Sequence, residues 1–280
     1  MATRYSSLIE YSEAAAVFER ASTHIAHVLT QFDPISLAEM EHVALLDRTD
    51  TKYILRASQL QSALEHIAGR YRVLETAGTR LNNYQTLYFD TPGFALYRQH
   101  HNGLRSRYKV RVRQYVDSDL AFWEVKRKTN RERTIKARLQ VAEVVPAIND
   151  RQIDSFVDTN APLDAQQLEP KLWNRFVRIT LVSKYCPERL TLDLNLEFAW
   201  GDAYVSLPGI VIAEVKQERL SQRSDFIQQM RRLGVRPTRF SKYCAGVGAL
   251  YDNVKVNNFK PRMRLVEKLM QEEWVYEHVR

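Results

Sequence analysis

The most constraining feature of this sequence is a set of strand-like segments in which alternate residues are charged. Residues 108–115 read YKVRVRQY, and residues 122–139 read FWEVKRKTNRERTIKARL. Their β-branched and aromatic residues predict β-strands, in which alternate side chains lie on opposite faces. The cations at such alternate positions are Arg105, Arg107, Lys109, Arg111, Arg113, Lys126, Lys128, Lys136, Arg138, Arg178 and Lys216. Like charges on neighbouring strands repel, so this face of a sheet needs an anion.

A second alternating segment separates polar side chains from leucines. Over residues 189–197 the polar face is expected to carry Arg189, Thr191, Asp193, Asn195 and Glu197. The opposite face carries Leu190, Leu192, Leu194 and Leu196. Further strands are predicted within residues 48–55, 84–93 and 209–217. Strands with one apolar and one polar face are typical of antiparallel sheets.

Two arrangements would accommodate a cationic sheet face: an open basic sheet that binds nucleic acid, or a barrel with a charged lumen. Nucleic-acid binders interleave exposed aromatic residues with cations, whereas Trp123, Phe176 and the leucines of 190–196 are expected to lie opposite the charges. Amphipathic helices near both ends of the chain would cover an apolar exterior. We therefore expect an α+β fold, with a closed antiparallel β-tunnel that has a basic, polar lumen and is flanked by helices.

Helical periodicity precedes and follows the strand-rich middle of the chain. Apolar spacing predicts helices over residues 12–30, 33–46, 56–71, 218–235, 239–251 and 262–280. Ser58 is a candidate N-cap for the third of these, and Gly234 is expected to end the fourth. The sequence shows neither an internal repeat nor a linker rich in Pro, Gly or Ser, so we expect one folded domain.

Composition restricts the compartment and the class of partner. No stretch approaches the roughly 18 consecutive apolar residues of a membrane helix, and residues 1–20 lack the apolar core of a secretory signal. We expect a cytoplasmic protein without a membrane span. Cys186 and Cys244 have the spacing of neither a disulfide framework nor a zinc site, so free thiols are expected. The formal charge of +8 favours a polyanionic partner.

Two glutamates interrupt the cationic faces. Glu124 shares a strand face with Lys126, and Glu214 shares one with Lys216. A carboxylate among cations commonly serves as a salt-bridge partner. The alternative is a ligand for Mg²⁺ or Mn²⁺, because such an ion on a triphosphate needs only one or two protein carboxylates. The residues alone leave both interpretations open.

An ordered set of motifs resembles one known family. The motifs are LDRTDTKYIL (46–55), LYFDT (87–91), KVRVRQY (109–115), EVKRKTNRERTIKARL (124–139), RFVRITLVSKYCPERLTLDLNL (175–196), IAEVKQ (212–217) and RFSKYCAG (239–246). Together they resemble the polyphosphate polymerase domain of the vacuolar transporter chaperone (VTC) family, within the triphosphate tunnel metalloenzymes. The resemblance predicts an N-terminal helical segment (1–35), a VTC-like tunnel domain (36–250) and a C-terminal helical tail (251–280).

The resemblance implies that ATP binds in the tunnel and passes its terminal phosphoryl group to a growing polyphosphate chain, with Mn²⁺ or Mg²⁺ as cofactor. The residues that match phosphate-contacting positions are Lys52, Arg111, Arg113, Lys128, Lys136, Arg178, Arg189, Arg239, Ser241 and Lys242. Glu214 matches the metal-binding glutamate, and Glu124 is a second candidate ligand. Lys126 and Lys216 are expected to support substrate binding, without nucleic acid as a partner.

Two features of relatives are absent from the sequence. It has no segment resembling a phosphate-sensing domain and no membrane span, so coupling to transport would need a separate membrane protein as partner. Tunnel triphosphatases of the same superfamily carry several carboxylates in an ExExK pattern, where this chain offers only Asp50 and Lys52. Three functions stay open: a polyphosphate polymerase, a triphosphatase that hydrolyses tripolyphosphate or a nucleoside triphosphate, and a non-catalytic polyphosphate-binding module.

Overall fold

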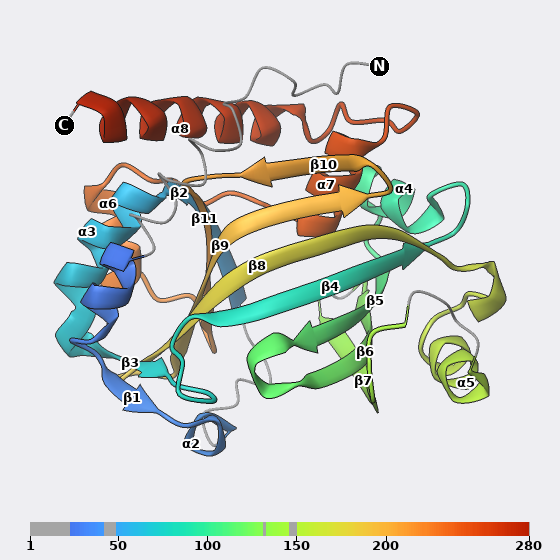
Figure 1. Cartoon of the computed structure of the whole chain (residues 1–280), viewed down its shortest axis with the longest axis horizontal. Helices are drawn as coiled ribbons and strands as arrows, with labels where there is room; N and C mark the ends of the chain where they lie inside the picture. Colours follow the sequence, from blue (N-terminus) through green and yellow to red (C-terminus); the bar gives the residue numbers. More distant parts are fainter. Residues whose placement is uncertain (1–22, 42–48, 131–132, 146–149, 280) are drawn as a thin grey trace.

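The alternating segments form one large antiparallel sheet. The computed structural model describes residues 23–41, 49–130, 133–145 and 150–279. Its strands are β1 (Asp33–Ile35), β2 (Thr49–Arg56), β3 (Tyr71–Leu74), β4 (Asn82–Asp90), β5 (Arg107–Tyr115), β6 (Leu120–Lys128), β7 (Thr134–Val141), β8 (Glu169–Ser183), β9 (Glu188–Trp200), β10 (Ala203–Leu207) and β11 (Ile210–Gln217). The main strands follow the order β2-β11-β9-β8-β4-β5-β6-β7, and β3 and β10 attach to β8 and β9 (Figure 1).

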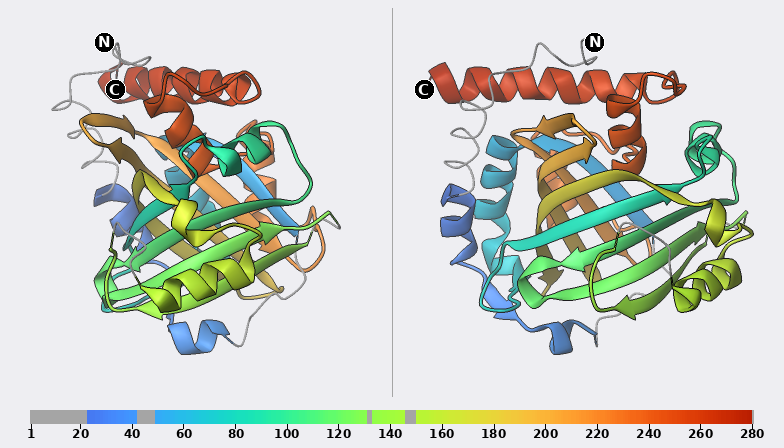
Figure 2. Two further views of the ribbon diagram at one scale, coloured as in Figure 1. Left: turned by 90° about the vertical axis from the view of Figure 1, so that its right-hand side faces the viewer. Right: turned by 45° about the vertical axis from the view of Figure 1, so that its right-hand side comes forward.

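The sheet is strongly curved but not closed, which corrects the predicted closed barrel. Strands β2 and β7 end the strand order, and no pairing joins them among the described residues. The free edge of β2 is covered where the Thr238 amide donates to the Lys52 carbonyl at 2.8 Å. Figure 2 shows the sheet curving around an interior, with β5, β6 and β7 on one side and β2 and β11 on the other. We call the unpaired interval between β7 and the covered edge of β2 the seam.

Helices pack on both faces of the sheet, as the α+β prediction requires. They are α2 (Leu37–Glu41), α3 (Ala57–Ile67), α4 (Ala95–His101), α5 (Arg151–Asn160), α6 (Asp225–Arg232), α7 (Lys242–Leu250) and α8 (Lys260–Val279). Helices α3 and α6 pack in one core cluster with Leu190 and Leu192 of β9. Helix α5 packs with Trp123 and Val125 of β6. Among the described helices, none has both the length and the apolar composition to cross a bilayer.

Three local predictions fall near the N-terminus. Residues 33–35 form β1, parallel to β3, so the helix predicted over 33–46 is wrong there; α2 begins only at Leu37, and residues 42–48 lie outside the described part. Ser58 is not the N-cap of α3, because Arg56 occupies that position. The Ser58 amide and hydroxyl donate instead to Glu273 of α8, at 2.9 and 2.5 Å. Residues 23–29 are helical, and residues 12–22 of that predicted helix are outside the described ranges.

Strand β9 does not keep one alternation along its length. Asn195 has a φ of 53°, and the pairing register of β8 with β9 shifts between Arg175 and Val177. Such a β-bulge exchanges the two faces of a strand. Leu196 therefore joins a different core cluster from Leu190, and Phe176 joins the same cluster as Leu196. The predicted polar face is correct before the bulge and wrong after it.

Helix α7 occupies the concave side at one end of the sheet. It contacts β8, β9 and β10, and its buried Tyr243 and Val247 share a cluster with Leu172 and Phe198. A Cβ atom at Gly246 would lie 2.6 Å from carbon atoms of both Leu172 and Phe198. This close approach requires glycine at position 246. The side chains of α7 and of the strands therefore fill this end of the interior.

We expect Gly246→Ala to lower the free energy of unfolding by about 1–3 kcal/mol, because overpacking outweighs the better helix propensity of alanine. Urea unfolding measures the change. Gly248→Ala in the same helix is the matched control, since its nearest neighbour is Val256 Cγ1 at 3.3 Å and the effect should be smaller. A Gly246→Ala protein as stable as the wild type would contradict this packing.

Candidate phosphate-binding tunnel

Three neighbouring strands place their charged side chains in rows on the concave face. In one row Lys109 of β5 is opposite Lys126 of β6, which is opposite Lys136 of β7. The next row contains Arg111, Glu124 and Arg138. Directly opposed cations destabilise a sheet unless an anion compensates them. The row of three lysines is therefore the strongest indication that this face binds an anion.

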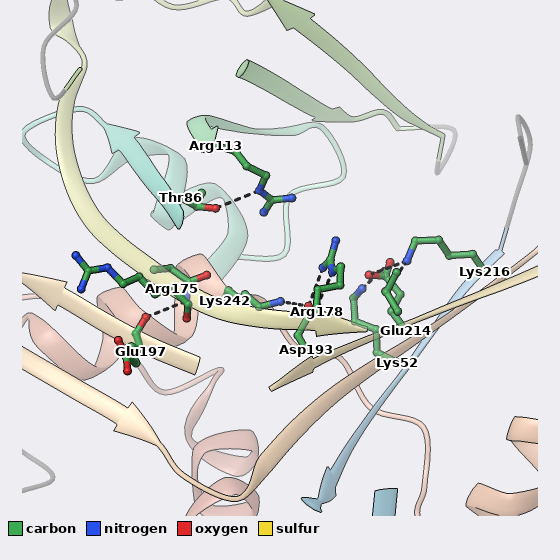
Figure 3. Close-up of polar contacts among 12 residues, drawn as sticks. Lys52, Thr86, Arg113, Arg175, Arg178, Asp193, Glu197, Glu214, Lys216 and Lys242 are labelled. Carbon is green, nitrogen blue, oxygen red and sulfur yellow. Dashed lines mark hydrogen bonds and ion pairs between the residues drawn. The ribbon is translucent and has the colours of Figure 1, made fainter. Parts of the chain in front are cut away.

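Charged groups from opposite walls of the sheet face one another across the interior. Burial lowers the pKa of Lys126 of β6, and the charge of Glu214 on β11 opposes this shift, although the two strands are far apart in the strand order. Burial also lowers the pKa of Lys242 of α7, and the charge of Arg113 on β5 adds to that shift. Figure 3 shows Arg113 and Thr86 on one wall, with Lys242, Arg178 and Lys216 approaching from other elements. The cations thus converge on one enclosed space.

Glu214 lies between two lysines on neighbouring strands. Lys52 Nζ is 2.8 Å from Glu214 Oε1, and Lys216 Nζ is 3.3 Å from Oε2 (Figure 3). Lys216 also donates to the Thr191 hydroxyl at 3.0 Å. Burial would raise the pKa of Glu214, but Lys216, Lys52 and Lys126 hold it well below its ordinary value. The carboxylate is therefore ionised at neutral pH.

Asp193 forms a second carboxylate centre. Arg178 donates to its two oxygens at 2.5 and 2.8 Å, and Lys242 pairs with Oδ2. Asp193 is only 3% exposed, so the pair fixes the orientation of the Arg178 guanidinium. The sequence placed Asp193 on the polar face of its strand but gave it no role, because nothing in the chain order shows that α7 brings Lys242 to it.

Glu124 is enclosed by three cations. Arg111 Nη2 lies 2.5 Å from its Oε2, Arg138 Nε lies 3.2 Å from its Oε1, and Lys136 also pairs with Oε1. The glutamate is 0% exposed. Burial would raise the pKa of Glu124, but Arg111, Arg113 and Lys136 together hold it well below its ordinary value. This arrangement favours the salt-bridge interpretation of Glu124 over the metal-ligand one, since three cations surround a carboxylate that is fully buried, whereas Glu214 has two and is 18% exposed.

Three interior cations have no carboxylate within ion-pair distance among the described residues. Arg113 donates to the Thr86 hydroxyl at 3.1 Å and is 5% exposed. Lys109 donates to the Ser241 hydroxyl at 3.0 Å, and Lys126 makes no hydrogen bond to any described residue. Arg113 is buried and the two lysines are half-buried, and cations withdrawn from water without a close counter-ion are costly. These three are therefore the groups that an anion would compensate. Lys109 was not predicted as a site residue, although its place in the alternating strand was the available signal.

Aromatic rings support the cations on one side of the interior. The Arg113 guanidinium lies 5.5 Å from the Tyr84 ring centroid and 5.6 Å from that of Phe176. Arg178 and Lys242 also lie over the Phe176 ring, at 5.2 and 4.2 Å. The expectation that Phe176 lies opposite the charges is therefore wrong, because Phe176 and Arg178 are two residues apart in β8 and share its concave face.

The remaining predicted site residues lie at the ends of the same elements. Lys128 is half-buried at the end of β6, opposite Arg107, and Arg189 is opposite Lys216. Ser241 is the N-cap of α7 and accepts from the Cys244 amide at 3.3 Å. Arg239 is exposed, next to Thr238 at the covered edge of β2. The structure brings the central members of the predicted set together and leaves Arg239 at the surface.

Proton binding by the interior lysines gives a pH prediction. Burial lowers the pKa of Lys109 and that of Lys126 from 10.5 to about 8. Between about pH 8 and pH 10 the unfolded chain holds protons that the folded protein has released, so stability should rise with pH. Urea unfolding across this range measures the slope. Lys126→Met should reduce that slope, and an unchanged slope would contradict the burial of a charge at Lys126.

A metal ion would need ligands from outside the protein at this site. Within the described residues no group of three or more His, Cys, Asp or Glu side chains is placed to hold one. Glu214 is ionised and faces the interior, so it suits a hard divalent cation. Because Lys52 and Lys216 occupy its oxygens, the fit requires phosphate oxygens as additional ligands and a shift of at least one lysine.

Comparisons with known proteins give the family. A solved putative adenylate cyclase from Bacillus halodurans has 11% identity and a TM-score of 0.45, over 76% of this chain and 97% of that one. A putative adenylyl cyclase from Hippeastrum, described as revealing a dominant triphosphatase activity, has 14% identity and a TM-score of 0.47, over 73% and 98%. No curated protein matches the chain. Residues 47–251 match the family model of the VTC domain, and the chain therefore belongs to the VTC domain family.

Proposed function

We propose that this protein transfers the terminal phosphoryl group of ATP to the end of a growing inorganic polyphosphate chain. The observation that carries the proposal is the convergence, in a chain of the VTC domain family, of Lys109, Lys126 and Arg113 on one interior without carboxylate partners. A polyphosphate and a triphosphate both present rows of anionic oxygens to such cations. Phosphoryl transfer asks a protein mainly for positioning and for positive charge around the transferred group.

The proposed reaction uses groups of the substrates as nucleophile and leaving group. A terminal oxygen of polyphosphate bonds to the γ-phosphorus of ATP, and the bond from that phosphorus to the bridging oxygen breaks, releasing ADP. Arg178, held by both oxygens of Asp193, presents its remaining donors in a fixed orientation. Lys109 and Lys126 contribute charge, and no serine or histidine nucleophile is needed.

Glu214 is the residue that we propose to hold Mn²⁺ or Mg²⁺. Such an ion, bound jointly by the carboxylate and the phosphates, would add positive charge beside the transferred group. The neighbouring lysines keep Glu214 deprotonated, which is the state that binds a cation. With an ion on Glu214, Lys52 and Lys216 would be free to bind phosphate oxygens.

The test is to incubate the purified protein with ATP and Mn²⁺ and to follow both polymer and free phosphate. Polymer stained on a gel, formed in proportion to ADP, is the expected result. Orthophosphate in proportion to ADP, without polymer, would show that water is the acceptor and that the protein is a triphosphatase. Binding of polyphosphate with no ADP release would show a non-catalytic module.

A further inference from the structure

The cluster around Glu124 extends from the interior to the surface. Its three cations come from successive positions across the sheet: Arg111 on β5, Lys136 and Arg138 on the terminal strand β7. The exposed fraction of their side chains rises from 15% for Arg111 to 30% for Lys136 and 48% for Arg138. The buried carboxylate of Glu124 is thus paired with three cations whose exposure increases from β5 to β7. Positive charge therefore extends from the interior to the surface.

Arg138 is exposed yet fixed in position. Its Nε is 3.2 Å from Glu124 Oε1, its Nη2 donates to the Tyr115 hydroxyl at 3.1 Å, and its guanidinium lies 5.5 Å from the centroid of the Phe122 ring. An exposed arginine usually pays conformational entropy when it binds a ligand. Here the entropy is already lost, and three of the five N–H donors remain for an anion.

The route of a long phosphate chain is constrained by α7. At that end of the interior, Gly246 packs directly on Leu172 and Phe198, so a chain cannot pass between the helix and the sheet. The seam offers another direction, because β7 has no strand beyond it among the described residues. The side chains of β7 are exposed or half-exposed along its whole length.

We propose that polyphosphate leaves the interior sideways across β7, with Arg138 as its outer contact. The proposal rests on the proposed function, since it concerns the product of that reaction. The phosphate at the centre of the interior is bound by Lys109, Lys126 and Arg113. Phosphates further along the chain pass Lys136 and reach Arg138 at the surface. Arg138 therefore contributes to the affinity for a long chain and not for a ligand as short as tripolyphosphate.

Binding measurements on two ligands test this route. Affinities of tripolyphosphate and of a long-chain polyphosphate are compared, at one fixed salt concentration, for the wild type, Arg138→Ala and Arg127→Ala. Arg127 is the matched control: it is also exposed and stacked on an aromatic ring, 5.5 Å from that of Tyr108, but it alternates with Lys126 and so lies on the convex face. Thermal melts without ligand establish that both variants are folded, and Arg138→Lys reports whether charge alone suffices.

The expected result is that Arg138→Ala binds long-chain polyphosphate about tenfold more weakly and tripolyphosphate less than about twofold more weakly, the loss of one charge-assisted hydrogen bond. Arg127→Ala should bind both ligands as the wild type does. Equal weakening for both ligands, no weakening, or the same weakening in Arg127→Ala would overturn the proposed route. A wild type that binds neither ligand would instead remove the proposed function.

Discussion

Glu214→Gln should reduce metal-dependent turnover of ATP by roughly a hundredfold, the effect of removing one electrostatic group from a phosphoryl-transfer site. The amide keeps the size of the side chain but cannot hold a divalent cation with comparable strength. Affinity for metal-free tripolyphosphate should be retained or rise, since a negative charge has left the interior and Lys52 and Lys216 no longer have a carboxylate partner. Steady-state kinetics with Mn²⁺ and calorimetric titration measure the two quantities.

Glu188→Gln is the matched control for this substitution. Glu188 is a fully buried glutamate of the same sheet, and its partners are the neutral side chains of Tyr71, Ser224 and Gln217. Its replacement should change stability without a selective loss of metal-dependent turnover. If Glu214→Gln turned over ATP as fast as the wild type, Glu214 would be a salt-bridge partner only.

Replacing two arginines of β5 should change the stability of the ligand-free protein to very different extents. Arg111→Ala removes the cation that pairs with Oε2 of Glu124, a carboxylate that is 0% exposed, and breaking such a buried pair should cost about 3 kcal/mol. Arg113→Met removes a buried cation that has no carboxylate partner among the described residues, so stability should stay within about 1 kcal/mol of the wild type. Urea unfolding of both variants measures the contrast.

Tripolyphosphate binding should be weakened in Arg113→Met, the variant whose stability is nearly unchanged. Arg113→Met should lose about 1.5–3 kcal/mol of tripolyphosphate affinity, because the guanidinium makes charge-assisted hydrogen bonds only when an anion is present. Tripolyphosphate should consequently raise the melting temperature of this variant less than that of the wild type. Two variants with equal stability loss would show that Arg113 is as much a structural partner as Arg111.

Sequence reasoning succeeded where one strand decides the geometry. The alternation in β5, β6 and β7 placed Lys109, Lys126 and Lys136 on one face without knowledge of their register, because period two is a property of the strand itself. The same reasoning failed at Asn195, where a single left-handed residue shifts the β8–β9 pairing and turns Leu196 to the concave face. Nothing in the local sequence distinguishes this asparagine from its neighbours on the polar face.

Contacts between residues of distant segments could not be predicted from the sequence. The role of Asp193 depends on Lys242, which reaches it only because α7 packs into the concave side. The capping of α3 by Glu273 joins residues that are 215 positions apart. Whether Glu124 is a metal ligand or an ion-pair partner likewise depended on how many cations surround it, and three side chains from two strands give that answer only in the folded protein.

The most direct test of the tunnel is a crystal structure of the protein with tripolyphosphate. We predict phosphate density on the concave face of the sheet, within hydrogen-bond distance of Lys109, Lys126 and Arg113, with Lys109 turned from the Ser241 hydroxyl towards the ligand. Density confined to cations of the convex face, with Lys109 still bonded to Ser241, would contradict the account.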